Sequence, residues 1–246
     1  ICEEHNLILA EDNCESLGAV YKGKALGTIG FFGTYSTFYS HHICTMEGGV
    51  IVTDDKILYE YMLAIRAHGW TRNLPEDSTI YQKKDDLFYE SFNFIVPGFN
   101  LRPLEMEGAI GLKQLPKIDR MLENRRKNAA YFKERMKEFP QIRLQKEVEQ
   151  SSWFGFSMVL TGDLAGKRAE LVKALNEAHI ECRPIVAGNF TRNTIIKYMD
   201  YRIPEELVNA DDVHDHGLFI GNHSQNNSVQ IDYFIETIHK FIKGIK

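Results

Sequence analysis

The chain has 246 residues, of which 43% are hydrophobic and 26% charged, and this balance excludes a disordered or fibrous protein. The length predicts one large domain or one and a half, with enough core to fold without disulfides or a structural metal. The 29 Lys and Arg against 34 Asp and Glu leave a net charge of −5, which excludes the basic surface that nucleic acid or an anionic membrane attracts. We therefore expect a small-molecule partner, no nucleic acid and no membrane.

The cysteines and the N-terminus indicate where the protein works. The four cysteines, Cys2, Cys14, Cys44 and Cys182, include no C-x-x-C pair, so neither a metal site nor a disulfide framework is indicated. This favours a reducing compartment and predicts a cytoplasmic protein. No apolar run approaches the ~20 residues that span a bilayer, and the acidic opening is unlike a signal peptide. Because the sequence opens at Ile1 with a pattern typical of the end of a helix, we expect an N-terminally truncated chain.

The first part of the sequence predicts an α/β sheet. Residues 7–10 form a short apolar run typical of a buried parallel strand. Glu11 and Asp12 follow at its carboxyl end, where open α/β sheets bind their ligands. Residues 50–53, which come after two glycines, predict another strand.

A helix and a long connection are expected next. Asp54 or Asp55 suits the N-cap of an amphipathic helix, which should end at Gly69. Residues 71–99 are polar and irregular, typical of a connection that binds a ligand or is mobile. Pro103 stands where the first turn of a further helix would tolerate it.

Beyond Pro116 the patterns predict a connector and a small α+β domain. A long amphipathic helix should run from there to about Phe139 and lead into the second domain. The elements expected after it are a strand at 154–160, a helix at 167–178, a short strand at 180–183, a strand at 217–221 and a helix at 230–242.

Polar residues of possible chemical use are densest between Asp12 and Gly49. They are Glu-Asp at 11–12, Ser-Thr-Phe-Tyr-Ser-His-His at 36–42 and Glu-Gly-Gly at 47–49. Taken singly, an acidic pair after a strand is more often a helix cap, and a His-His pair in a loop is usually an exposed polar pair. Their order and spacing together resemble the sugar aminotransferase family (DegT/DnrJ/EryC1/StrS). In that family a strand-end E-D is followed by S-F-x-P-[ST]-K and then E-G-G.

The resemblance extends over nearly the whole chain and carries a fold with it. Gly-Phe-Asn-Leu-Arg at 98–102 and Gly-Ala-Ile-Gly at 108–111 are similar to further family motifs. The implied fold class is α/β, the fold type I of pyridoxal phosphate (PLP)-dependent transferases, with a doubly wound sheet in the large domain. Residues 1–115 would be the C-terminal portion of the large cofactor-binding domain, and 116–246 a connector helix and a small α+β domain. The family's enzymes act as homodimers with shared active sites.

The resemblance also implies roles for individual residues. Asp12 matches the acid that pairs with the pyridine nitrogen of the cofactor, where a carboxylate keeps the nitrogen protonated. Ser36 matches the hydroxyl donor to the cofactor phosphate. Asn100 matches a residue that reaches the cofactor phosphate of the neighbouring subunit. Glu15 stands where many relatives have a Gln beside the cofactor, which leaves its role open.

The main departure from the family pattern is at His41. Counting six residues back from Glu47, or five forward from Ser36, reaches His41 where relatives have the lysine that binds the cofactor covalently, and there is no lysine from Ala25 to Asp55. An imidazole has no primary amine and cannot form that bond, but its ordinary pKa of ~6.5 suits it to moving protons. We predict that His41 is the catalytic base; an error of one residue in the count would select His42 instead.

This substitution is typical of the family's ketosugar 3-dehydratases, which hold the cofactor as pyridoxamine phosphate (PMP). The runs at 40–42, 152–156 and 181–186 are similar to the branch that acts on GDP-sugars. The resemblance implies 3-dehydration of a nucleotide-linked 4-keto-6-deoxyhexose, with GDP-4-keto-6-deoxymannose as substrate and glutamate as amine donor, in deoxysugar and lipopolysaccharide O-antigen biosynthesis. Arg183 lies in a segment that approaches the substrate in relatives, although a lone arginine there is as readily a solvated or interdomain residue.

Alternatives remain at this point. A CDP-sugar branch carries an iron-sulfur cluster on cysteines in the long connection, but residues 71–99 contain no cysteine, so we expect no cluster. Two alternatives to the dehydratase remain. The first is a nucleotide-sugar aminotransferase whose lysine comes from elsewhere, and the second is an inactive truncated fragment that dimerises without holding cofactor tightly.

Overall fold

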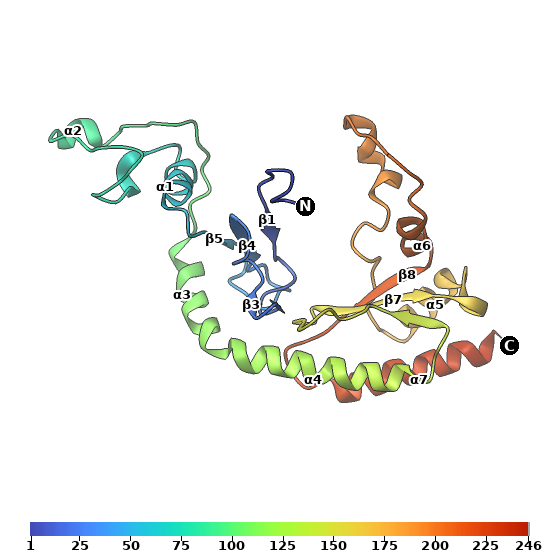
Figure 1. The fold of residues 1–246 in the computed structure, drawn as a ribbon. Helices are drawn as coiled ribbons and strands as arrows, with labels where there is room; N and C mark the ends of the chain where they lie inside the picture. Colours follow the sequence, from blue (N-terminus) through green and yellow to red (C-terminus); the bar gives the residue numbers. More distant parts are fainter. Residues whose placement is uncertain (246) are drawn as a thin grey trace. The chain divides into compact units, whose positions relative to one another are not determined.

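The computed structural model describes residues 1–245 and divides into two compact units, Ile1–Ile118 and the residues from Asp119 onward. The assignment of 1–115 and 116–246 as functional domains stays a prediction. The strands are β1 (Ala10–Asp12), β2 (Val20–Tyr21), β3 (Lys24–Ala25), β4 (Phe32–Ser36), β5 (Gly49–Val52), β6 (Ile142–Leu144), β7 (Gly155–Leu160) and β8 (Gly217–Gly221). The helices are α1 (Lys56–Ile65), α2 (Leu87–Glu90), α3 (Glu105–Gln114), α4 (Ile118–Met136), α5 (Arg168–Glu177), α6 (Val208–His216) and α7 (Ser228–Gly244), shown in Figure 1.

The first unit is built on a three-stranded sheet in the order β1-β4-β5. β1 is parallel to β4, with Asp12 opposite Thr34, and β5 is antiparallel to β4, with Gly49 opposite Ser36. The strand and helix expected after the two glycines are confirmed as β5 and α1. Asp55 is the N-cap of α1, since its side chain accepts from the backbone N–H of Leu58 at 2.7 Å. The central strand β4 was not predicted.

Three sequence expectations in this unit are wrong in detail. The first strand begins at Ala10, and Leu7 and Ile8 are 57% and 72% exposed, because only residues 10–12 pair with β4 and no described element covers the earlier ones. Helix α1 ends at Ile65, four residues before Gly69. Pro103 precedes the N-cap Leu104 and lies outside the first turn of α3.

The second unit is an α+β domain, as the sequence indicated. Its antiparallel sheet has the order β6-β7-β8, with α4 and α7 side by side along one face (Figure 1). The ring of Phe132 on α4 stacks on Phe156 of β7 at 4.1 Å between centroids and lies 5.8 Å from Phe234 of α7. These three rings are 1–2% exposed, so they form the centre of the core that joins the sheet to both helices.

One predicted element of this unit is absent. Residues 180–183 form no strand: Arg183 alone pairs with Phe219, through an isolated antiparallel bridge with N···O distances of 3.0 and 2.8 Å. Residues 180–182 make no bridge to β8, so the pairing is confined to one residue.

Candidate active site

The predicted cofactor residues Asp12 and Ser36 lie at the same edge of the sheet. β1 and β4 run parallel, so their carboxyl ends meet there, and Asp12 pairs with Thr34, two residues before Ser36. Asp12 is exposed. Its Oδ1 accepts hydrogen bonds from the N–H of Cys14 at 3.1 Å and from the hydroxyl of Thr34 at 3.4 Å. These bonds hold the carboxylate in place and leave it at the surface of the sheet edge.

The hydroxyl of Ser36 is placed to donate to an anion. Its oxygen accepts from the backbone N–H of Phe38 at 3.2 Å, and the residue is half-buried. A serine hydroxyl that accepts one bond still has its own proton to donate, and a phosphate oxygen is a suitable acceptor.

The loop from Thr37 to Gly48 carries both histidines and is closed at its base. The N–H of Thr37 donates to the carbonyl of Gly48 at 3.0 Å, and the N–H of Thr45 to the carbonyl of Thr37 at 2.8 Å. The Thr45 hydroxyl lies 2.6 Å from that of Thr37 and 2.6 Å from the Glu47 carbonyl. Both threonines are buried, so the loop ends are fixed next to Ser36. We call these hydrogen bonds of Thr37 and Thr45 the clasp. It was not predicted, because the sequence shows no signal for it beyond two threonines eight residues apart.

Within that loop the two histidines differ in access. His42 is 3% exposed, whereas His41 is half-buried. The N–H of His41 donates to the carbonyl of Phe38 at 3.0 Å, and the Phe38 and His41 rings meet edge to face at 5.7 Å. His41 thus lies on an ordered turn and is more exposed than His42, which suits a proton-transfer residue.

Glu15 and Asn100 lie in the same unit in less defined surroundings. Glu15 is half-buried in the turn after β1. Burial, the hydrogen bond with Asp12 and the negative charges of Asp12 and Glu15 raise the pKa of the neighbouring Cys14 thiol. Asn100 is exposed, pairs with Ala67 through an isolated bridge and accepts from Arg102 Nε at 3.2 Å. The structure therefore groups Asp12, Ser36 and the His41 loop at one sheet edge, but it supplies no contact that tests Glu15 or Asn100.

Arg183 belongs to the second unit. Its guanidinium lies over the Phe219 ring at 4.7 Å and near the Phe154 ring at 5.8 Å, a cation–π arrangement that fixes the side chain. This accounts for Arg183 within its own unit and leaves its predicted role toward the substrate untested.

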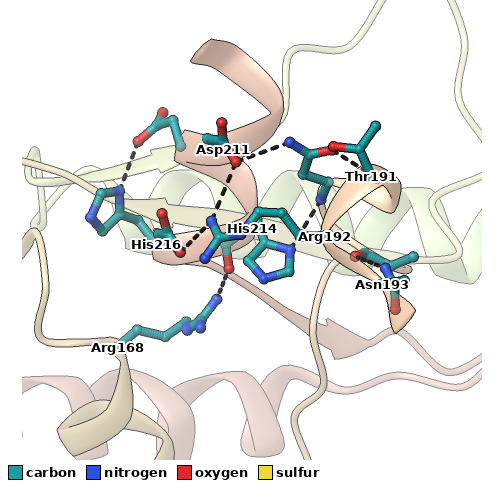
Figure 2. A network of polar contacts seen from close by, with 11 residues as sticks. Arg168, Thr191, Arg192, Asn193, Asp211, His214 and His216 are labelled. Atoms are coloured by element: carbon teal, nitrogen blue, oxygen red, sulfur yellow. Dashed lines mark hydrogen bonds and ion pairs between the residues drawn. The ribbon is translucent and has the colours of Figure 1, made fainter. Parts of the chain in front are cut away.

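The segment after Arg183 is held by a polar network on α6, shown in Figure 2. The backbone N–H of Asn189 donates to Nδ1 of His214 at 3.2 Å, and the side chain of Asn189 donates to Asp211 at 2.9 Å. Arg192 donates to Asp211 and Asp215, and Arg168 donates to the His214 carbonyl. A cavity of about 240 Å³ lies beside this segment, and Arg183 is not among its lining residues.

The side chains at the sheet edge fit a PLP-type cofactor. Such a cofactor has a protonated ring nitrogen that donates to a carboxylate and a phosphate that accepts from hydroxyl groups, and Asp12 and Ser36 supply the carboxylate and the hydroxyl from adjacent strand ends. Across residues 1–245, no three His, Cys, Asp or Glu side chains gather as metal ligands would. None of the helices in the same range is both long and apolar enough to cross a membrane.

Comparison with known proteins decides the family. Residues 1–239 match the model of the DegT/DnrJ/EryC1/StrS aminotransferase family. The chain belongs to this family. Among curated members, a GDP-4-keto-6-deoxy-D-mannose 3-dehydratase of Escherichia coli O55:H7 is 52% identical over 95% of this chain and 61% of its own length.

Solved structures of family members show the same fold. A GDP-4-keto-6-deoxymannose-3-dehydratase with a trapped PLP-glutamate geminal diamine is 52% identical, with a TM-score of 0.91 over 94% of this chain and 60% of that one. Another solved structure is a variant of ColD, a GDP-4-keto-6-deoxymannose-3-dehydratase, in which asparagine and lysine replace a serine and the histidine directly after it. It is 51% identical, with a TM-score of 0.92 over 95% of this chain and 62% of that one. These likenesses confirm the predicted fold class, and this chain spans about three fifths of the length of the relatives it matches.

Proposed function

We propose that this family member dehydrates carbon 3 of a nucleotide-linked 4-keto-6-deoxyhexose with PMP as cofactor. GDP-4-keto-6-deoxymannose is the proposed substrate, glutamate the amine donor, and deoxysugar and lipopolysaccharide O-antigen biosynthesis the proposed pathway class. Relatives at 52% identity support the substrate by their name and the amine donor by the PLP-glutamate adduct trapped in one of them. No iron-sulfur cluster is proposed.

The observation that carries the proposal is the half-buried His41 in the clasped loop next to Ser36, in a stretch from Ala25 to Asp55 without lysine. An imidazole there moves protons but makes no covalent bond to an aldehyde. The ColD variant supports the choice of His41 over His42: in that relative the altered histidine directly follows a serine, and Ser40-His41 is the one Ser-His pair in this sequence.

The residues of this chain would divide the work as follows. The chemistry that PMP supplies when bound is an amine that joins the sugar's keto carbon and a ring that takes up electron density. Asp12 would hold the proton on the ring nitrogen, and Ser36 would donate its hydroxyl to the phosphate. His41 would take a proton at its imidazole and return one to the hydroxyl that leaves carbon 3, so one group would serve both transfers.

The remaining assignments concern the assembly and the outer contacts of the site. Asn100 is exposed, as a residue that reaches the cofactor phosphate of a second subunit would be, and we assign it that role in a homodimer. Glu15 would lie beside the cofactor and Arg183 would contact the substrate. Four cysteines without a disulfide partner in the described residues suit a reducing cytoplasm as the site of action.

The test is an assay with GDP-4-keto-6-deoxymannose, glutamate and PMP, followed by the mass of the product. We expect a 3-deoxy ketosugar and ammonia. Treatment of the protein and PLP with borohydride, followed by peptide mapping, is the second arm, and we expect no covalently retained cofactor. A modified lysine peptide would indicate an aminotransferase, and a protein that neither binds PMP nor turns over would indicate an inactive fragment.

A further inference from the structure

Glu11, the residue before Asp12 on β1, has a carboxylate that is bound by three backbone amides. Its Oε1 accepts from the N–H groups of Gly30 at 2.6 Å and Ile29 at 2.7 Å, and its Oε2 accepts from the N–H of Gly27 at 2.7 Å. Successive amides that converge on one point form an anion-binding turn. In this protein the anion is the protein's own side chain.

The turn that binds Glu11 is packed directly onto the sheet. Gly27 has φ +95°, and a Cβ atom there would lie 2.1 Å from the hydroxyl of Tyr35. A Cβ atom on Gly33 would lie 2.1 Å from the carbonyl oxygen of Gly27, so both positions require glycine. The Tyr35 hydroxyl donates to the carbonyl of Leu26 at 2.6 Å. Turn 27–30 is thus a fixed part of the sheet surface.

The side chains of Glu11 and Asp12 lie on opposite faces of β1. Side chains alternate along a strand, and Glu11 and Asp12 pair with consecutive residues of β4, Gly33 and Thr34. β1 has only three paired residues, so its own ladder holds it weakly. The three amide bonds to Glu11 add to that ladder, and the Asp12 carboxylate stands on the other side of the same peptide unit.

The charge state of Glu11 is consistent with such a role. Burial alone would raise the pKa of its carboxyl, but the amides of Gly30, Gly27 and Ile29 together outweigh burial and hold that pKa below its ordinary value. Glu11 is therefore an anion at neutral pH, and bonds from N–H groups to an anion are about twice as strong as neutral ones.

We propose that Glu11 is a positioning residue for Asp12: by holding turn 27–30 on one face of β1, it fixes the Asp12 carboxylate on the other face where the cofactor ring nitrogen would lie. This inference rests on the proposed function, which assigns that nitrogen to Asp12.

The test compares Glu11→Gln with Glu60→Gln, a matched control in the same unit. The Glu60 carboxylate also accepts from backbone amides, those of Thr79 at 2.8 Å and Ile80 at 3.2 Å, but it lies on α1, and the partners of these bonds lie in the connection after α1. The first readout is the NMR shift and exchange protection of the Cys14 amide, which donates to Asp12 Oδ1. We expect Glu11→Gln to lower protection about tenfold at Gly27, Ile29 and also Cys14, while the control leaves all three unchanged.

The second readout is affinity for PMP relative to its 1-deaza analogue, in which carbon replaces the ring nitrogen. Only the nitrogen-bearing ring gains from an aligned carboxylate. We therefore expect the ratio of the two affinities to fall about tenfold in Glu11→Gln and to stay at the parent value in Glu60→Gln. Glu11→Asp, which keeps the charge on a side chain one methylene shorter, should change both readouts less, and it replaces the Gln variant if that variant does not fold.

The outcomes separate this inference from the proposed function. If Glu11→Gln loosens turn 27–30 but leaves the Cys14 amide and the affinity ratio as in the parent, Glu11 holds only its own turn and the inference is overturned. If the parent does not distinguish the two cofactors, the assignment of Asp12 to the ring nitrogen is overturned. In that case the Cys14 amide still decides whether Glu11 positions Asp12.

Discussion

The side chain of His42 is 3% exposed, while His41 beside it keeps part of its surface open. The N–H of His41 donates to the carbonyl of Phe38, and the hydrogen bonds of Thr37 and Thr45 close the loop that carries both histidines. A proton-transfer residue must reach its substrate, so the greater exposure of His41 supports the prediction that it, and not His42, is the base.

Replacing His41 by lysine tests this assignment at the level of one side chain. We expect His41→Lys to retain PLP covalently after borohydride reduction, because the variant has a primary amine at this position, and to lose dehydration by about 10²- to 10⁴-fold, because the base is gone. Peptide mapping and the sugar assay measure the two effects. The matched control is His42→Gln, which should form no covalent adduct and keep dehydration within a few fold of the parent. Dehydration at the parental rate in His41→Lys would identify another base.

At the level of elements, the carboxylates of Glu60 and Glu90 hold the long connection after α1 by hydrogen bonds. Glu60 on α1 is fully buried, and its Oε2 accepts from the hydroxyls of Ser78 and Thr79 at 3.0 and 2.9 Å in addition to the two backbone amides. Glu90 on α2 accepts from the hydroxyl of Tyr81 at 2.7 Å, which raises the pKa of Tyr81 to about 12. The connection is polar in sequence, and these hydrogen bonds help to order it.

The pH dependence of that anchoring follows from the Glu60 carboxyl. Burial would raise its pKa, but the hydrogen bonds from Thr79, Ser78 and Ile80 outweigh burial and lower it. A carboxyl whose pKa is lower in the folded than in the unfolded state stabilises the fold above its unfolded pKa of about 4.3, and that contribution is lost as the pH falls through the folded value. We expect Glu60→Gln to reduce exchange protection at Thr79 and Ile80 about tenfold at pH 7, and this reduction to shrink steadily as the pH falls below about 4.3. A reduction that stays constant as the pH is lowered through that range, after correction for intrinsic exchange, would contradict this account.

For the whole molecule, the first unit exposes many large apolar side chains. Around and along α3 they include Phe99, Leu101, Leu104, Met106 and Leu112, each 62–72% exposed. Large apolar side chains that are exposed along one helix are typical of an interface. It supports the homodimer assigned under the proposed function.

Sedimentation velocity tests that assembly. We expect the parent chain to sediment with twice the monomer mass at micromolar concentration. Leu112→Glu, which puts a charge on α3, should shift it toward monomer, whereas Val148→Glu, at a residue 65% exposed in the second unit, should leave the mass unchanged. A parent that is monomeric throughout, or equal behaviour of the two variants, would contradict the assignment.

Local patterns in the sequence predicted the family and about half of the strands and helices. The elements α1, α4, α5, α7, β5, β7 and β8 all follow from periodicity and caps. Periodicity failed at residues 7–9 and 180–182, where the pattern suits a strand but no neighbouring strand pairs with them. It also missed β4, whose short run with a glycine has no strong local signal, as well as β2, β3, β6, α2 and α6.

The order of residues along the chain is enough to identify the candidate groups: Asp12 after a strand, a hydroxyl at 36, a histidine where relatives have lysine, and the motifs that place the chain in its family. Only the folded chain shows which of these groups meet at one sheet edge, which of the two histidines is the more exposed, and that Glu11 binds three amides 16 to 19 residues away. The reason is physical. Residue type and spacing are properties of the chain, whereas register, burial and long-range hydrogen bonds exist only once strands distant in sequence have paired.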